Sequence, residues 1–244
     1  MRIVVVADVH ANLEAFEAVL QHARDNGGID AIWSLGDLVG YGPDPMACIS
    51  LLRSFEHSAI AGNHDYAAIG QIGVDVFNPH AAAASLWTAK QLDRKARAWI
   101  NGLEPEMVLK PAFTLAHGSL SDPIWEYLVY PDSAAVHLMR QTTPYGFVGH
   151  THLPQIFFAR TNGAEPLWIK DGYVLQLSAD RFVANPGSVG QPRDGDPRAA
   201  YAALDTTAES VTFHRVAYDI QKTQTKMRAA GLPDVLWQRL EAGR

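Results

Sequence analysis

The sequence predicts an α/β fold in which two sheets carry helices on their outer faces. Three observations support this prediction. Strand-like and helix-like segments alternate over residues 2–61, small clusters of polar residues follow the apolar runs, and short strands separated by turn residues fill residues 155–216. Alternating strands and helices are typical of a largely parallel sheet, and closely spaced strands are typical of antiparallel pairing.

The first part of the chain supplies the alternating segments. Residues 2–6 are rich in β-branched side chains and are expected to form a strand that is buried on both faces. Asn12 is placed to cap a following helix with one apolar stripe, which Gly27 and Gly28 end. The next expected elements are a strand at 31–35, a helix at 45–55, a strand at 58–61 and a long helix at 80–103.

The second part of the chain is richer in strands. Two strands, at 113–116 and 145–148, each end just before a histidine. Six further strands are expected at 155–159, 167–169, 173–177, 182–184, 200–204 and 211–216, followed by a helical tail at 219–240. We expect these six strands to form a second, mostly antiparallel sheet. Because the chain shows no repeat and no obvious linker, we expect residues 1–244 to form a single domain.

The composition excludes several classes of protein. The 244 residues are 48% hydrophobic and carry a net charge of −6, which argues against a general nucleic-acid or acidic-membrane surface but not against a phosphate substrate. The sequence lacks an apolar run of about 18 residues, so it does not predict a membrane span. The single cysteine, Cys48, excludes an internal disulfide and fits a reducing compartment. The apolar run at 3–6 is too short for a signal peptide, so we expect a cytoplasmic protein without a membrane partner.

Metal-ligating residue types follow five of the apolar runs. For any one cluster alone, a turn or a helix cap is the favoured explanation. Together they provide carboxylate, amide and imidazole groups, which suit two divalent cations that share a carboxylate. The clusters are Asp8-Val9-His10, Gly36-Asp37, Gly62-Asn63-His64-Asp65, Ala116-His117-Gly118 and Gly149-His150-Thr151-His152.

The order of these clusters resembles that of the calcineurin-like metallophosphoesterase superfamily. The resemblance runs from Asp8 to His152, and residues 185–188, Asn-Pro-Gly-Ser, resemble a segment of its bacterial and archaeal branch of small phosphodiesterases. It implies a four-layer α/β-β/α sandwich. It also implies that Asp8, His10, Asp37 and His152 bind a first metal, and that Asp37, Asn63, His117 and His150 bind a second, with Asp37 bridging.

The resemblance further implies that His64 is a catalytic histidine that does not bind metal. Asp65 would then orient His64 and select the nitrogen that carries the proton. The chemistry expected is hydrolysis of phosphate esters, with a metal-bridging hydroxide as nucleophile and His64 as general acid. Two divalent ions are implied as cofactors; manganese is favoured, and iron, zinc, nickel and cobalt are alternatives.

Several functional alternatives remain open at the level of the sequence. A phosphodiesterase is favoured, and a diadenosine-tetraphosphatase-like enzyme or a serine/threonine protein phosphatase is the alternative at the level of substrate. A non-catalytic metal-binding scaffold is the alternative of another class. The expected partner is a small phosphate ester or a nucleotide, and the sequence leaves homo-oligomerisation open.

Candidate substrate-binding residues have equally plain structural explanations. Asn63 and Asn12 are placed near the metals, although Asn12 serves equally well as a helix cap. Tyr41 follows the bridging Asp37 closely and is a candidate for substrate contact or for loop packing. Arg193 could bind a phosphate oxygen, but a solvent-exposed loop position is favoured. The aromatic residues of 125–127 could line a pocket for a ring, but an aromatic core cluster is favoured.

Overall fold

Two six-stranded sheets form the centre of the protein in a computed structural model, which describes residues 1–109, 111–177 and 180–244. The strand order is β3-β2-β1-β11-β12-β9 in the first sheet and β4-β5-β6-β10-β7-β8 in the second. The first sheet consists of β1 (Arg2–Val6), β2 (Ala31–Ser34), β3 (His57–Ala59), β9 (Val174–Gln176), β11 (Ala199–Asp205) and β12 (Ser210–Val216). The second consists of β4 (Glu106–Leu109), β5 (Phe113–Ala116), β6 (Tyr145–Val148), β7 (Gln155–Arg160), β8 (Gly163–Trp168) and β10 (Phe182–Asn185).

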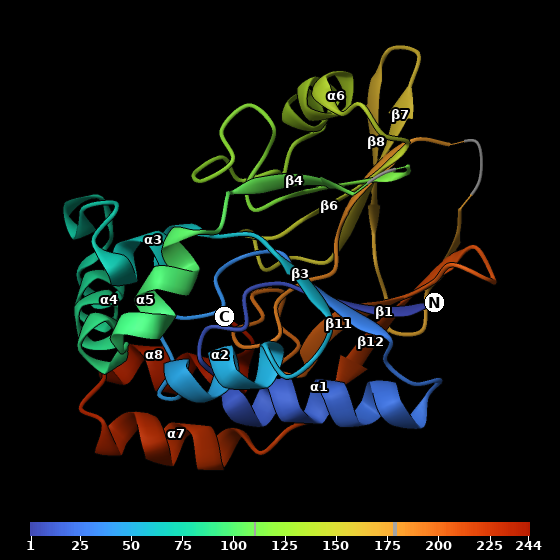
Figure 1. The fold of residues 1–244 in the computed structure, drawn as a ribbon. Coiled ribbons are helices and arrows are strands. Elements are labelled where there is room, and N and C mark those ends of the chain that lie inside the picture. The colour runs from blue at the N-terminus through green and yellow to red at the C-terminus, as the bar shows by residue number, and fades with distance from the viewer. Residues whose placement is uncertain (110, 178–179) are drawn as a thin grey trace.

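Helices cover the outer faces of both sheets (Figure 1). The first sheet is covered by α1 (Leu13–Asp25) and α2 (Pro45–Leu52), with α7 (Ile220–Ala229) packed against α1, and the second by α6 (Pro131–Arg140). At one end lie α3 (Asn63–Ile69), α4 (Pro79–Gln91), α5 (Arg94–Asn101) and α8 (Asp234–Gln238), with short 3₁₀ turns at Val74–Val76 and Arg239–Ala242. The prediction of a four-layer α/β-β/α sandwich is confirmed.

The side chains of β1 show how the layers are held together. Successive residues of a strand point to opposite faces, so Val4 and Val6 pack with Phe16 in the core beneath α1. Val5 points the other way and packs with Phe147 in the core between the two sheets. All five side chains are almost completely buried, and burial of each stabilises the fold by about 1.5–3 kcal/mol relative to exposure.

The expectation that the late strands form a sheet of their own is wrong. β11 pairs antiparallel with β1, in a register that places Val4 opposite Ala203, and brings β12 and β9 into the first sheet. β10 instead pairs parallel with β6 and joins β7 and β8 to the second sheet. Both sheets are therefore mixed. Without β11, one edge of β1 would be left unpaired. The alternation of apolar and polar residues within β11 does not reveal which strand it will pair with.

The prediction of one long helix at 80–103 is also wrong, because two helices, α4 and α5, occupy this range. Leu92 is extended (φ −74°, ψ 125°), which ends α4, and Asp93 starts α5 because its carboxylate accepts a hydrogen bond from Ala96 N at 2.7 Å. The expected helical tail is present, but it divides into α7 and α8 around residues 230–233. Among the described residues, no helix combines the length and apolarity that a membrane span requires.

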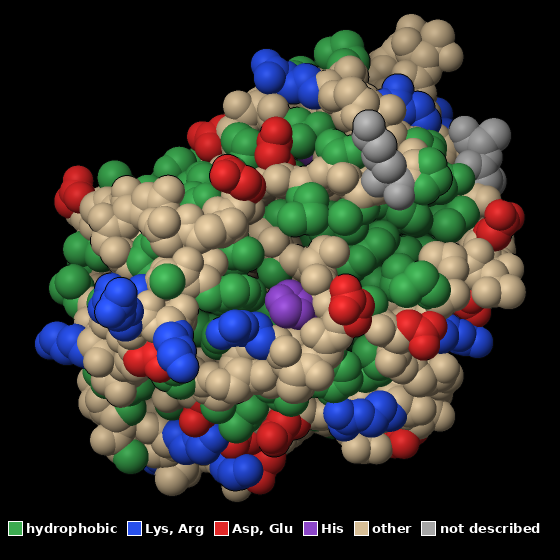
Figure 2. Space-filling model, viewed as in Figure 1, with side chains coloured by type: hydrophobic (Ala, Val, Ile, Leu, Met, Phe, Trp, Pro, Cys, Tyr) green, Lys and Arg blue, Asp and Glu red, His purple; other side chains and the backbone are tan. Residues whose placement is uncertain are grey.

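Charged side chains of both signs are mixed on the face of the molecule shown in Figure 2. Lys and Arg side chains lie among Asp and Glu side chains there, which agrees with the modest net charge of −6. A surface of this kind does not provide the continuous basic stripe that tracks a nucleic-acid backbone.

Candidate metal centre

The site lies where the carboxyl ends of parallel strands from both sheets meet. β1, β2 and β3 run parallel in the first sheet, and β5, β6 and β10 run parallel in the second. Ligands bind beyond the carboxyl ends of strands in sheets of this type. The residues that follow these strands are Asp8 and His10, Asp37, Asn63 and His64, His117, His150 and His152, and the segment 186–191.

The backbone of these loops adopts conformations that L-residues rarely take. Asp8, His10, Asp37, His150 and His152 have φ values of 53°, 49°, 51°, 66° and 60°. Each such conformation costs on the order of 1–3 kcal/mol and persists only where the surroundings enforce it. Ala11 and Tyr41 share this feature, and Glu209, in the turn between β11 and β12, is the remaining described example outside glycine. Strain is therefore concentrated at the site.

Two glycines allow the loops to approach this closely. A Cβ on Gly62 would lie 2.1 Å from Asp37 Oδ1, and one on Gly36 would lie 2.7 Å from both Gly62 N and His117 Nδ1. Gly36 also has a φ of 88°, which disfavours any side chain.

The first group of metal-ligating side chains consists of Asp8, His10 and His152, whose donor atoms lie within 4.8 Å of one another. His10 Nδ1 faces Val39 O at 3.2 Å, and His152 Nδ1 faces Gln191 O at 2.6 Å, so both rings donate N–H from Nδ1. The two Nε2 atoms, 3.1 Å apart, then present lone pairs to each other. His152 Nε2 also lies 3.6 Å from Asp8 Oδ1. A cation between these atoms would turn mutual repulsion into coordination.

The second group consists of Asp37, His117 and His150. His117 Nδ1 donates to Leu35 O at 2.8 Å, which leaves Nε2 facing Asp37 Oδ2 at 3.5 Å and Asn63 Oδ1 at 3.2 Å. Asp37 Oδ2 also lies 3.7 Å from His10 Nε2, which belongs to the first group. The carboxylate of Asp37 is therefore shared by the two groups.

The titration behaviour of the site agrees with a metal-binding role. Burial raises the pKa of Asp8 to about 7, and burial together with Asp65 raises the pKa of Asp37 well above its usual range. Burial lowers the pKa of His10, His150 and His152 well below the usual value, which keeps their rings neutral, as metal ligation requires. His150 Nε2 is buried without a hydrogen-bond partner among the described residues. A cation would offset the cost of ionising the two buried carboxyls, and carboxylate oxygens together with neutral imidazoles fit divalent transition-metal ions.

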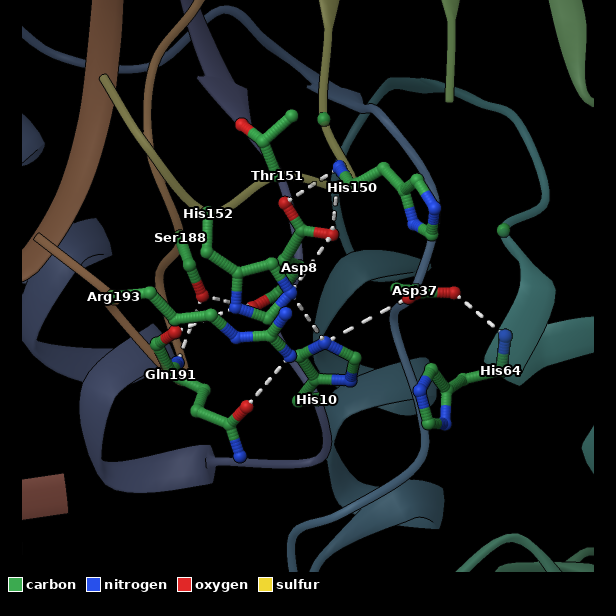
Figure 3. Close-up of polar contacts among 12 residues, drawn as sticks. Asp8, His10, Asp37, His64, His150, Thr151, His152, Ser188, Gln191 and Arg193 are labelled. Atoms are coloured by element: carbon green, nitrogen blue, oxygen red, sulfur yellow. Dashed lines mark hydrogen bonds and ion pairs between the residues drawn. The ribbon is translucent and has the colours of Figure 1, made fainter. Parts of the chain in front are cut away.

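Neighbouring backbone and side chains hold the ligands in place (Figure 3). His150 N donates to both carboxylate oxygens of Asp8 at 3.1 Å. Ser188 Oγ donates to Asp8 O at 2.8 Å, and Asn185 Nδ2 donates to Gly149 O at 2.6 Å. The end of β10 and the turn that follows it thus support the loops of Asp8 and His150.

Asp65 does not contact the ring of His64. Its carboxylate accepts hydrogen bonds from Gly62 N at 2.9 Å, Val39 N at 3.1 Å and Leu38 N at 3.4 Å. The expectation that Asp65 orients His64 is corrected accordingly: Asp65 ties the Asp37 loop to the start of α3. Among the described residues, the side chain beside His64 Nδ1 is Ser85 on α4, with its Oγ at 3.4 Å.

A pocket of about 210 Å³ opens onto this centre and is lined by three of the four candidate substrate-binding residues, Tyr41, Asn63 and Arg193. Asn12 is the exception, because its side chain caps α1 through Ala15 N and bonds to Gly190 O and Tyr218 Oη. The helix-cap interpretation of Asn12 therefore replaces the substrate-binding one.

The sequence did not point to two residues of this pocket, and it favoured a core position for two others. Phe77 and Asn78 line it with Trp125 and Tyr127. Trp125 and Tyr127 are 37% and 49% exposed, so the expected aromatic core cluster at 125–127 is wrong. Neither Phe77 nor Ser85 carries a motif, and their proximity to His64 depends on how α3 and α4 pack, which local sequence does not specify.

The chain is similar to known phosphoesterases over most of its length. The profile of the calcineurin-like phosphoesterase superfamily domain matches residues 1–209. A solved metallophosphoesterase from Sphaerobacter thermophilus is 47% identical, with a TM-score of 0.89, over 100% of this chain and 99% of that one. An uncharacterised protein of Methanocaldococcus jannaschii is 36% identical over 99% of this chain and 98% of its own.

A more distant similarity concerns a curated enzyme. The symmetrical bis(5'-nucleosyl)-tetraphosphatase of Aggregatibacter actinomycetemcomitans is 26% identical over 126 residues, which are 50% of this chain and 45% of that protein. The matched segment thus spans less than half of the relative. Its activity alone does not identify the substrate of this chain.

Proposed function

We propose that this chain, which belongs to the calcineurin-like phosphoesterase superfamily, is a two-metal hydrolase of phosphate esters that prefers diesters. The observation that carries the proposal is the position of Asp37 between the two groups of ligands, 3.5 Å from His117 Nε2 and 3.7 Å from His10 Nε2. A carboxylate shared in this way suits a pair of divalent cations.

Each group of side chains would hold one of the two ions. Asp8, His10, His152 and Asp37 would hold the first, and Asp37, Asn63, His117 and His150 would hold the second. When bound, the two ions supply positive charge for the phosphoryl oxygens and activate a water molecule as the nucleophile. Manganese suits the mixed nitrogen and oxygen ligands; iron, zinc, nickel and cobalt suit them as well.

His64 is placed to assist the leaving group. Its backbone N–H donates to Asp37 Oδ1 at 2.8 Å, which fixes the residue beside the bridging carboxylate, and its side chain lines the pocket. Burial lowers the pKa of His64 well below the usual value. An anionic phosphate beside the ring would favour its protonated form, and with Ser85 Oγ beside Nδ1 the imidazolium could then give its Nε2 proton to the departing oxygen.

Arg193 is placed to bind a non-bridging oxygen of the phosphate. Its guanidinium lines the pocket and donates to Gln191 Oε1 at 2.9 Å, while its buried Nε has no hydrogen-bond partner among the described residues. An unsatisfied buried N–H is costly, and an anionic oxygen of the substrate would satisfy it.

The remaining alternatives are less well supported. The curated tetraphosphatase relatives, which match about half of the chain, leave a dinucleoside polyphosphate as the second candidate substrate. His64, Asp37 and Arg193 line one pocket. A non-catalytic scaffold would not require this arrangement, so it favours a catalytic role. A cytoplasmic location and a single domain over residues 1–244 stay predictions.

A direct assay tests the proposal. Protein purified with manganese should cleave bis-p-nitrophenyl phosphate faster than p-nitrophenyl phosphate, and chelation should abolish both reactions. Faster cleavage of the monoester would contradict the preference for diesters. A metal-loaded protein that cleaves neither ester nor any dinucleoside polyphosphate would refute the hydrolase assignment.

A further inference from the structure

Aromatic side chains, two exposed and one half-buried, surround one side of the pocket beside the candidate metal ligands. Trp125 and Tyr127 come from the loop between β5 and α6, and Phe77 comes from the connection between α3 and α4. Phe77 meets the ring of Trp125 edge to face, with the ring centres 5.5 Å apart and the planes at 66°. The side chains of Trp125 and Tyr127 are 37% and 49% exposed, although large apolar surfaces are normally buried.

The aromatic rings are coupled to the catalytic and metal-ligating histidines. Phe77 packs edge to face on His64, with the ring centres 5.0 Å apart. Tyr127 stacks on the ring of His150 at 4.2 Å and 8°, and His150 forms a hydrogen bond with the backbone of Trp125. The three rings therefore line the same pocket as the histidines that would surround a bound phosphate.

The loop that carries Trp125 is held by its own hydrogen bonds. Asp122 Oδ1 accepts from Trp125 N at 3.0 Å and from Ile124 N at 3.2 Å. Ser119 Oγ accepts from Asp122 N at 3.2 Å and donates to Glu126. A rigid loop presents an aromatic face without a further loss of conformational entropy when a ligand binds.

We propose that Trp125, Phe77 and Tyr127 form a subsite that stacks on the nucleobase of a nucleotide ester whose phosphate lies on the metals and Arg193. This inference rests on the proposed function and adds the class of substrate. Aromatic side chains recognise bases by stacking. Asn78 lines the same pocket, and because its Oδ1 caps α4, its amide nitrogen remains to donate to a polar edge of the base.

The ligand is expected to be a mononucleotide or a short nucleotide ester rather than a polymer. The cavity measures about 210 Å³, and the chain carries a net charge of −6. Cationic side chains on the face in Figure 2 are interspersed with acidic ones, so a long phosphate backbone finds no continuous basic track there.

Two p-nitrophenyl diesters that share their leaving group and charge test the subsite. One carries thymidine through its 5′ oxygen and the other carries a methyl group. We expect KM for the thymidine ester to be on the order of tenfold lower, a ratio within the range that stacking on one ring gives. Trp125→Ala should raise KM for the thymidine ester alone, and Trp125→Phe should restore much of the difference. Trp168→Ala, at an exposed tryptophan of β8, is the matched control and should change neither value.

Equal KM values for the two esters in the unaltered protein would overturn the subsite while leaving the proposed hydrolase intact. Calorimetry gives a readout that does not depend on turnover: adenosine 5′-monophosphate should bind the manganese-loaded protein more tightly than ribose 5-phosphate, which has no base. Equal binding of these two would also overturn the subsite, even if neither diester were cleaved. O-phosphotyrosine that bound as tightly as the nucleotide would overturn the nucleobase assignment in favour of a phosphoprotein.

Discussion

Two clusters of histidines in this protein both adjoin a cavity but differ in chemistry. The first is the candidate metal centre. The second lies on the helix-covered face of the first sheet, where His22 Nδ1 contacts Tyr201 Oη at 2.8 Å and His214 stacks on Tyr201 with ring centres 4.9 Å apart. Tyr201 and His214 line a cavity of about 330 Å³, which is larger than the 210 Å³ pocket at the metal centre.

The difference lies in what orients the rings. At the metal centre, backbone carbonyls accept N–H from Nδ1 of His10, His117 and His152, so each Nε2 lone pair is aimed at a carboxylate. In the second cluster, one ring is satisfied by a tyrosine hydroxyl, and the nearby carboxylate of Asp205 is paired with Arg2 at 3.1 Å. Proximity of imidazoles and cavity size therefore do not define a metal site; oriented lone pairs and unpaired carboxylates do.

The largest effect is expected for Asp37→Asn. Loss of the shared carboxylate should release at least one metal ion per chain and lower kcat/KM for bis-p-nitrophenyl phosphate by about a thousandfold or more, because several kcal/mol of charge stabilisation are lost. Elemental analysis of the purified protein and steady-state kinetics measure both. The double variant His22→Ala/His214→Ala is the control, and a loss of metal from it would refute the distinction between the clusters.

A smaller loss of activity is expected for His64→Ala. Removal of a general acid should lower kcat by on the order of 10²–10⁴-fold, while metal content stays near that of the unaltered protein. The same two measurements check this. Loss of metal from the variant would instead make His64 a ligand.

A third histidine environment predicts a pH dependence of stability. His137 is buried in α6, where burial lowers its pKa to about 4. The unfolded chain, with an ordinary pKa near 6.5, binds this proton first as the pH falls. The contribution of neutral His137 to the free energy of unfolding is therefore fully present above about pH 6.5. It is lost as the pH falls from 6.5 to 4, by about 3 kcal/mol in total.

Urea unfolding of metal-free protein at pH 7 and pH 4.5 tests this dependence. The loss of stability between these values should be smaller in His137→Gln than in the unaltered protein, by about 2 kcal/mol. Equal losses in the two proteins would show that His137 does not carry the acid sensitivity. The comparison between variants cancels the contribution of the buried carboxylates, which titrate in both.

The smallest effect is expected in the second cluster. Tyr201→Phe removes the hydroxyl that contacts His22 and should lower the free energy of unfolding by about 1 kcal/mol, without a change in metal content or kcat/KM. Thermal unfolding followed by circular dichroism measures the stability. A tenfold loss of activity would mean that this cluster communicates with the site.

The grouping of the candidate ligands was predictable from the sequence because each follows a strand. Asp8, Asp37 and His117 could be placed at strand ends from apolar runs alone, and parallel pairing then brings those ends together. The partners that aim the ligands were not predictable in this way, because Leu35 O, Val39 O and Gln191 O are backbone groups that any residue supplies. The neighbours of His64 depend on helix packing, so the sequence pointed to Asp65 where the structure places Ser85. Likewise, nothing local marked β11 as the partner of β1.

Anomalous diffraction from crystals grown with manganese tests the central claim most directly. The account predicts two peaks about 3.5–4 Å apart, both within coordination distance of the Asp37 carboxylate. A single peak, or two peaks of which only one touches Asp37, would contradict it.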